Sequence, residues 1–114
     1  MKIEQIEELK KELEEAVKRL LSDKLKKIVL YGSYARGDYD KESDIDFAVI
    51  ASVTLQQINE YDDELADICL DLSLKYDVLV SVMIISEENF NGYHEILPCY
   101  SNLVKEGIPI YGIQ

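Results

Sequence analysis

Apolar residues near the start of the chain recur every three or four positions. Between residues 3 and 21 they form one stripe, and glutamate and lysine fill the positions between them. This spacing puts the apolar side chains on one side of an amphipathic helix. The pattern therefore predicts a helix over residues 3–21 with one buried face. The residues of that stripe are Ile3, Ile6, Leu9, Leu13, Val17 and Leu20.

Two apolar runs then predict two strands joined by a polar segment. Residues 26–31 are rich in β-branched and aliphatic side chains and stop at Gly32, which is typical of a short buried strand. Residues 37–43 are polar and predict a loop. Residues 43–50 alternate at first and become fully apolar, which predicts a second strand that is more deeply buried towards its end.

The next segment predicts a long helix and a third strand. Thr54 and Gln57 have the spacing of a capping box at the start of a helix. Apolar residues continue at helical spacing from Leu55 to Leu72. The run "YDVLVSVMIIS", residues 76–86, then predicts a strand.

Proline and glycine delimit the last two predicted elements. Pro98 suits the first turn of a helix, and Gly107 suits the end of that helix. The run "IPIYG" predicts an edge strand, because Pro109 has no N–H group to donate to a neighbouring strand. The order of elements is typical of one α/β domain covering residues 1–114.

Composition limits the classes of function that this chain can have. With 114 residues, 47% of them apolar, it can form one compact core. No run approaches the roughly 18 apolar residues that a membrane helix needs, and the N-terminus does not resemble a signal peptide, so we expect a cytoplasmic protein. Cys69 and Cys99 are expected to stay reduced, with Cys69 packed on an apolar helix face. The net charge of −11 argues against direct nucleic-acid binding and favours a basic protein partner or an anion held through metal ions.

Asp44 and Asp46 are the first candidate site residues. Residues i and i+2 of a strand point to the same face, roughly 6.6 Å apart. Two carboxylates at that spacing can share a pair of Mg²⁺ ions, which accept hard oxygen ligands and keep sites open for phosphate. Asp38 and Asp40 have the same spacing, but only Asp44 and Asp46 lead directly into a buried strand.

Gly32, Ser33 and Arg36 are the second group of candidates. A glycine after a strand lets backbone N–H groups approach an anion, and a helix that opens there adds its dipole. The Ser33 hydroxyl can donate to a phosphate oxygen, and Arg36, one helical turn later, can offer a planar cation. Gly-Ser alone is common in ordinary turns, but its combination with Ser-Asp-Ile-Asp after a short loop is specific.

The segments "GSYARG" and "SDIDFAV" resemble the signature of the minimal nucleotidyltransferases, a family of the polymerase-beta-like superfamily. The resemblance extends from the strand at Lys26 to the final "EGIPIY". It implies a nucleotidyltransferase fold, with a small mixed sheet flanked by helices in a single minimal domain. It also implies that Gly32 and Ser33 bind the triphosphate of ATP and that Asp44 and Asp46 bind two magnesium ions.

A third carboxylate completes the metal site in that family and assists the attacking hydroxyl. Asp77 is the acid best placed for this role, because it would share one face of the third strand with Leu79, Ser81 and Met83. The alternative is an aspartate at a strand end that faces water. The resemblance implies in-line attack on the α-phosphorus, release of pyrophosphate, and strict dependence on a divalent metal.

The acceptor is the part of the reaction that this chain does not define. Larger relatives carry an extra domain for the acceptor, so we expect another subunit or a separate protein to supply it here. The resemblance implies an antitoxin that transfers AMP to a tyrosine of a HEPN-type toxin. Two alternatives stay open: transfer to a small molecule such as an aminoglycoside within an oligomer, and a non-catalytic module that acts by binding alone.

Overall fold

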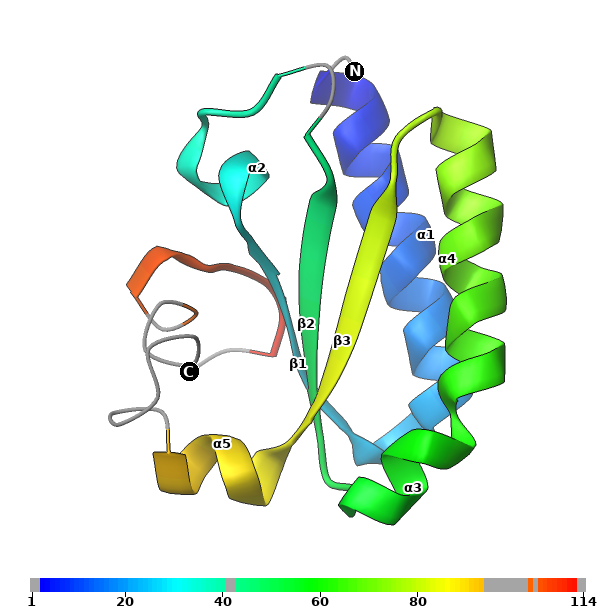
Figure 1. The fold of residues 1–114 in the computed structure, drawn as a ribbon, viewed down its shortest axis with the longest axis vertical. Coiled ribbons are helices and arrows are strands. Elements are labelled where there is room, and N and C mark those ends of the chain that lie inside the picture. The colour runs from blue at the N-terminus through cyan, green and yellow to red at the C-terminus, as the bar shows by residue number, and fades with distance from the viewer. Residues whose placement is uncertain (1–2, 41–42, 94–102, 104, 113–114) are drawn as a thin grey trace.

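The helices and strands of the protein are seen in a computed structural model, which describes residues 3–40, 43–93, 103 and 105–112. The elements are α1 (Ile3–Leu21), η1 (Ser22–Lys24), β1 (Leu25–Tyr31), α2 (Ser33–Arg36), β2 (Ile45–Ala51), α3 (Leu55–Glu60), α4 (Asp62–Tyr76), β3 (Val80–Ser86), α5 (Glu87–Tyr93) and β4 (Ile108–Tyr111). Figure 1 shows them gathered around one sheet.

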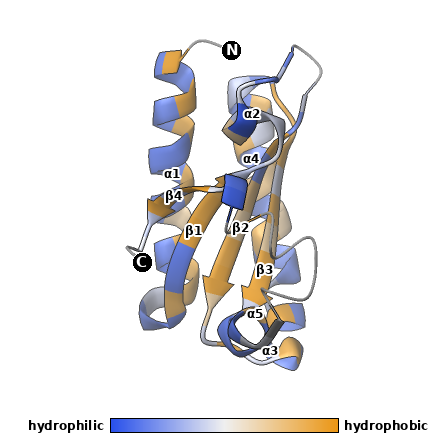
Figure 2. Ribbon diagram, turned by 90° about the vertical axis from the view of Figure 1, so that its left-hand side faces the viewer, coloured by the Kyte–Doolittle hydropathy of each residue, from blue (hydrophilic) through white to orange (hydrophobic). Residues whose placement is uncertain are grey.

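The sheet has four strands in the order β3-β2-β1-β4. β1 pairs antiparallel with β2 and with β4, whereas β2 pairs parallel with β3. The sheet is therefore mixed, and helices α1 and α4 lie together along one of its faces (Figure 1). Helix α5 lies near the opposite end of the sheet from α2. Figure 2 shows that the strands carry the most continuous apolar sequence of the molecule.

Helix α1 packs its apolar stripe against the sheet, as its sequence pattern predicts. Leu9 and Leu13 are fully buried and join a cluster that includes Phe47 of β2. Burying a side chain of this size stabilises the fold by about 1.5–3 kcal/mol relative to leaving it in water. The predicted bounds of this helix are confirmed, but its ends differ in burial. Ile3 is 73% exposed, and Leu21, rather than Leu20, is the last fully buried position of the stripe.

A second, smaller cluster covers part of the other face of the sheet. It comprises Val29, Ala48, Ile50, Ile85, Phe90 and Leu103. Phe90 belongs to α5, a helix that the sequence pattern did not predict, because "EENFNGY" contains little apolar sequence. Helix α5 therefore covers the sheet where β2 and β3 end, and the beginnings of those strands lie at the other end.

Three predicted elements have different bounds in the structure. The strand predicted over residues 43–50 is β2, which begins at Ile45 and ends at Ala51, so Asp44 lies just before the strand and not on it. The helix expected from Leu55 to Leu72 is divided at Tyr61 into α3 and α4. The capping box of Thr54 and Gln57 at its start is confirmed, with both reciprocal hydrogen bonds present. The third strand was predicted to begin at residue 76, which is wrong: α4 continues to Tyr76, and β3 begins at Val80.

The C-terminal part is described only in pieces. The predicted helix start at Pro98 lies outside the described residues, as does Cys99. Leu103, Lys105 and Glu106 are helical, and the backbone N–H of Gly107 donates to the carbonyl of Leu103. The predicted edge strand is confirmed as β4. In the described part of the chain, no helix is long and apolar enough to cross a membrane.

Candidate active site

The turn after β1 brings the backbone of Gly32 against the carboxylate of Asp46. Tyr31 and Asp46 are register partners across β1 and β2, so the residue after Tyr31 meets the start of β2. A Cβ atom built on Gly32 would lie 2.7 Å from Oδ2 of Asp46, and the φ of Gly32 is +76°. Both observations require glycine here. The Gly-Ser turn and Asp46, separated in sequence, therefore lie side by side.

Helix α2 begins directly after this glycine and consists of a single turn. The N–H groups of Ala35 and Arg36 donate to the Gly32 carbonyl, both at 3.1 Å, and Gly37 ends the helix in the left-handed conformation. Ser33 is the first residue of the helix and is partly exposed. Because the first N–H groups of a helix have no carbonyl partner within it, they are available to an anion.

Asp44 and Asp46 stand at the start of β2. Asp46 is the second residue of the strand and is half-buried, whereas Asp44 precedes the strand and is exposed. Burial, together with the negative charge of Asp44, raises the pKa of Asp46. A bound cation opposes both effects, because it replaces lost hydration and neutralises the repulsion between the carboxylates. Two carboxylates joined by phosphate oxygens and water are a ligand set that fits Mg²⁺.

Asp77 is placed differently from the sequence expectation. It is not on β3 but caps the C-terminal end of α4 in the left-handed conformation, with φ 52° and ψ 46°. Its N–H donates to the carbonyl of Ser73, and its side chain is exposed. Among the described residues, no three His, Cys, Asp or Glu side chains form a group that could hold a metal ion. The structure puts Asp77 at the same end of the sheet as Asp44 but does not gather it into such a group.

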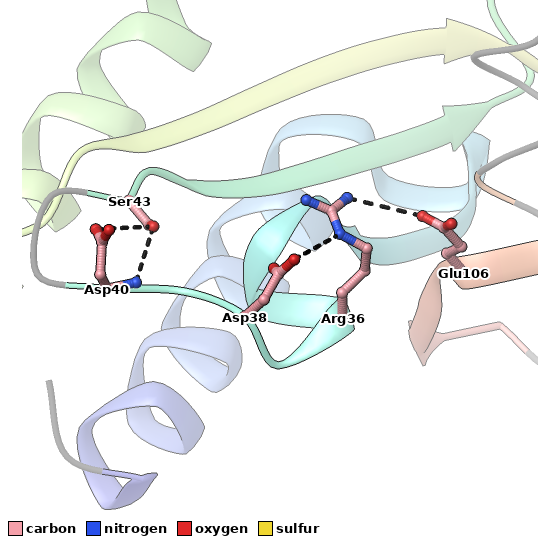
Figure 3. Close-up of polar contacts among 5 residues, drawn as sticks. All are labelled: Arg36, Asp38, Asp40, Ser43 and Glu106. Atoms are coloured by element: carbon pink, nitrogen blue, oxygen red, sulfur yellow. Dashed lines mark hydrogen bonds and ion pairs between the residues drawn. The ribbon is translucent and has the colours of Figure 1, made fainter.

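Arg36 is held by two acidic side chains, as Figure 3 shows. Its Nε atom lies 3.3 Å from Oδ2 of Asp38, and its Nη1 atom lies 3.7 Å from Oε2 of Glu106. Both pairs are largely exposed, so each contributes at most about 1 kcal/mol. The predicted contact of Arg36 with phosphate is compatible with such weak pairs, which can exchange for a ligand.

In the segment between α2 and β2, the aspartate that hydrogen-bonds with Ser43 is Asp40. The Ser43 hydroxyl donates to Oδ1 of Asp40 at 3.2 Å and accepts from the Asp40 N–H at 3.0 Å (Figure 3). Asp38 and Asp40 thus contact neighbours within their own segment. Tyr34 and Tyr39 stack on each other, with ring centroids 4.1 Å apart, and Tyr34 is buried. The contacts between Asp40 and Ser43 join described residues on both sides of positions 41–42, ahead of the paired aspartates.

One residue beside the site was not selected by sequence reasoning. Ser81 of β3 is the register partner of Asp46 of β2 and is exposed. Alternation along the strand places it on one face with Leu79 and Met83, a grouping visible in the sequence. The pairing with Asp46 was not visible there, because it depends on where β3 begins and how it aligns with β2.

A mixed sheet with a Gly-Ser turn after its first strand, and paired aspartates opening the next strand, defines a nucleotidyltransferase. Comparison with known families agrees. Residues 7–106 match the family described as "Nucleotidyltransferase domain", and the chain belongs to that family.

Similar proteins include a relative in Methanocaldococcus jannaschii named "Putative protein adenylyltransferase MJ0604". It is 38% identical over 106 residues, which cover 89% of this chain and 93% of the relative. Two solved structures share the fold. A toxin–antitoxin crystal structure with AMP-PNP has a TM-score of 0.60 at 24% identity, covering 92% of this chain and 74% of that one. A tri-AMPylated Shewanella oneidensis HEPN toxin in complex with an MNT antitoxin has a TM-score of 0.56 at 22% identity, covering 95% and 73%.

Proposed function

We propose that this nucleotidyltransferase transfers AMP from ATP to a side-chain hydroxyl of a partner protein. The observation that carries the proposal is the contact between the Gly32 backbone and the Asp46 carboxylate. It joins a turn suited to phosphates to a pair of carboxylates suited to magnesium. The choice of a protein as acceptor is supported by the Methanocaldococcus jannaschii relative, whose name describes a protein adenylyltransferase.

Each proposed site residue has a separate task in the reaction. The Gly32–Ser33 turn binds and orients the triphosphate. Asp44 and Asp46 would hold the magnesium, and the metal would neutralise charge on the triphosphate and lower the pKa of the acceptor hydroxyl. The acceptor oxygen forms a bond to the α-phosphorus, the bond from that phosphorus to the pyrophosphate oxygen breaks, and pyrophosphate leaves. Asp77 is proposed to take the proton of the acceptor hydroxyl.

The proposed partner is a HEPN-type toxin, with a tyrosine hydroxyl as the acceptor. Support comes from two neighbours in fold, a toxin–antitoxin pair with AMP-PNP and a HEPN toxin carrying AMP groups in complex with an MNT antitoxin. The net charge of −11 suits a basic partner, because opposite potentials steer association.

The test uses the full chain, Mg-ATP and the protein encoded beside it in the genome. Intact-mass measurement should show one or more AMP additions on that protein. The Asp44→Asn, Asp46→Asn double variant should add none, whereas Asp38→Asn, which removes an acid from the same segment, should retain activity. Neutralisation of the partner by the double variant, with no AMP added by the wild type, would favour a module that acts by binding alone.

A further inference from the structure

We propose that Leu79, which immediately precedes β3, together with Ser81 and Met83 of β3, forms the surface on which the acceptor protein docks. We call these three residues the β3 face. This inference rests on the proposed transfer of AMP to a protein and assigns the surface that selects the acceptor.

The register of the sheet puts the β3 face next to the paired aspartates. Ser81 is paired with Asp46, and the Ile45 N–H donates to the carbonyl of Leu79 at 3.0 Å. Side chains two apart on a strand point to one face. Met83 therefore lies with Ser81 on the face of the sheet that carries the Asp46 carboxylate. Leu79 flanks Ser81 on the other side, because its carbonyl continues the pairing with β2 just before β3 begins.

The solvent exposure of the side chains on this face changes sharply between Ile85, which is buried, and Met83. Ile85, two residues further along β3, is 3% exposed and packs in the cluster with Phe90 of α5. Leu79 is 60% exposed and Met83 is 36% exposed. Covering these apolar side chains with an apolar residue of a partner would remove them from water and so favour binding directly beside Asp46. The uncovered part of the face is the part that adjoins Asp46.

Helix α4 closes the outer edge of β3 against strand addition. The Val80 N–H donates to the hydroxyl of Ser73 at 2.9 Å, and the Val82 backbone hydrogen-bonds to the thiol of Cys69. Figure 1 shows α4 running beside β3 at this edge. Because these backbone groups already have partners, they do not pair with an added strand at the part of β3 next to the site. A ligand there is expected to bind through the side chains of the β3 face.

The direction from which the acceptor must attack phosphorus also points to the β3 side of Asp46. The Gly32–Ser33 turn follows β1, so the phosphates lie on the β1 side of Asp46. In phosphoryl transfer the attacking and leaving oxygens are roughly in line on opposite sides of phosphorus. The sheet order places β1 and β3 on opposite sides of β2. An acceptor opposite the leaving pyrophosphate therefore approaches over β3.

The chemistry of the β3 face favours a protein segment as the occupant. Two apolar side chains around one hydroxyl suit an apolar or aromatic residue next to the acceptor hydroxyl. They offer few hydrogen bonds to a sugar-like molecule, whose many hydroxyl groups would lose water without replacement. The acceptor is thus expected to present its hydroxyl from an apolar patch.

The test compares two double variants that each replace two exposed apolar residues. Leu79→Ser with Met83→Ser alters the β3 face. Leu70→Ser with Leu74→Ser alters the outer side of α4, where these leucines are 57% and 74% exposed, and serves as the matched control. Thermal unfolding checks that both variants fold. The acceptor is the protein that the wild type modifies in the intact-mass assay.

For the β3-face variant we expect the KM for the acceptor protein to rise by about tenfold or more, as for other buried interface contacts. Calorimetry without ATP should show weaker binding of the acceptor. The affinity for Mg-AMP-PNP should stay at the wild-type value, and the α4 variant should behave as wild type in every assay. Loss of AMP-PNP binding would instead assign the β3 face to the nucleotide and overturn the proposal.

The two proposals fail in different ways. If the wild type modifies the acceptor and the β3-face variant does so equally well, the docking surface is wrong and the proposed function stands. If only the α4 variant is impaired, the acceptor docks on α4. If the wild type adds AMP to no protein, the proposed function fails and this inference fails with it.

Discussion

At the scale of single residues, Gly32 offers the sharpest test of the site. Replacing it with alanine introduces a Cβ that meets Asp46 Oδ2 at 2.7 Å in a conformation that alanine avoids. We expect Gly32→Ala to lower adenylyl transfer by about 100-fold, because a displacement of about 1 Å at a reacting centre has that effect. Pyrophosphate release in the presence of the acceptor protein and saturating Mg-ATP measures the loss.

Gly37 provides the control for this substitution. Its φ is +83°, but nothing lies within 4 Å of a Cβ built there. Both alanine variants should lose about 1 kcal/mol of unfolding free energy through backbone strain. Only Gly32→Ala should lose activity beyond what its stability explains. Equal activity in the two variants would show that contact with Asp46 does not matter.

Asp77 can be tested without disturbing the fold. Its left-handed conformation is one that asparagine also accepts, so Asp77→Asn should leave the free energy of unfolding within about 0.5 kcal/mol of wild type. If Asp77 takes the proton of the acceptor, the variant should lose at least about tenfold in kcat. An unchanged kcat and pH profile would remove Asp77 from the mechanism.

At the scale of elements, the contact between α1 and α4 depends on Glu12. Its carboxylate pairs with Lys75 and accepts a hydrogen bond from the Tyr76 hydroxyl at 2.6 Å. Hydrogen bonds from Lys75 and Tyr76 lower the pKa of Glu12. Burial and the same hydrogen bond raise the pKa of Tyr76 to about 12, so its hydroxyl remains a donor well above neutral pH.

The direction of the Glu12 shift predicts how stability depends on pH. A carboxylate whose pKa is lowered on folding stabilises the protein above its unfolded pKa and loses that contribution as pH falls through the folded pKa. Glu12→Gln should therefore be less stable than wild type at pH 7, by no more than about 1 kcal/mol because the pair is largely exposed.

Urea unfolding at a series of pH values measures this difference, which should disappear in acid, below the lowered pKa of Glu12. Glu7→Gln is the control, since Glu7 pairs with Lys10 within α1 and does not join two elements. A difference for Glu12→Gln that persists unchanged in acid would contradict the role of its charge.

The elements also show what the sequence pattern can and cannot predict. The stripe of α1 and the apolar run of β1 were predicted to within a residue at each end, because burial on one face leaves a periodic signal and burial on both faces leaves a continuous apolar run. The start of β3 was not predicted. Residues 76–79 look like strand, but Tyr76 stays helical and packs against α1, and Ser73 accepts from the Val80 N–H. Contacts with a distant helix decide that boundary, and local propensity does not reveal them.

The same limit applies to the site. The approach of Gly32 to Asp46 follows from a strand, a short loop and a returning strand, all local in sequence, and was therefore predictable. The places of Asp77 and Ser81 depend on where α4 ends and on the register between β2 and β3. Those are properties of the assembled sheet, so the sequence pattern put Asp77 on the strand and left Ser81 unselected.

At the scale of the whole molecule, the dominant feature is excess negative charge. There are 23 Asp and Glu residues against 12 Lys and Arg residues, which gives the net charge of −11. The ion pairs among the described side chains are mostly exposed, as with Lys75–Glu12 and Arg36–Asp38, and do little to offset this repulsion. Self-repulsion destabilises a compact state and is weakened by salt. Any cation is therefore expected to stabilise the protein to some extent.

A divalent cation should act at the site as well as on the overall charge, and the two effects can be separated. Raising NaCl about tenfold should raise the unfolding temperature of the wild type and of the Asp44→Asn, Asp46→Asn variant by similar amounts, since screening is general. Millimolar MgCl₂ together with AMP-PNP should raise it further only in the wild type, because ligand binding to the native state adds stability. Differential scanning calorimetry measures both shifts. An equal magnesium effect in the two proteins would mean that the cations act only on the overall charge and that Asp44 and Asp46 hold none.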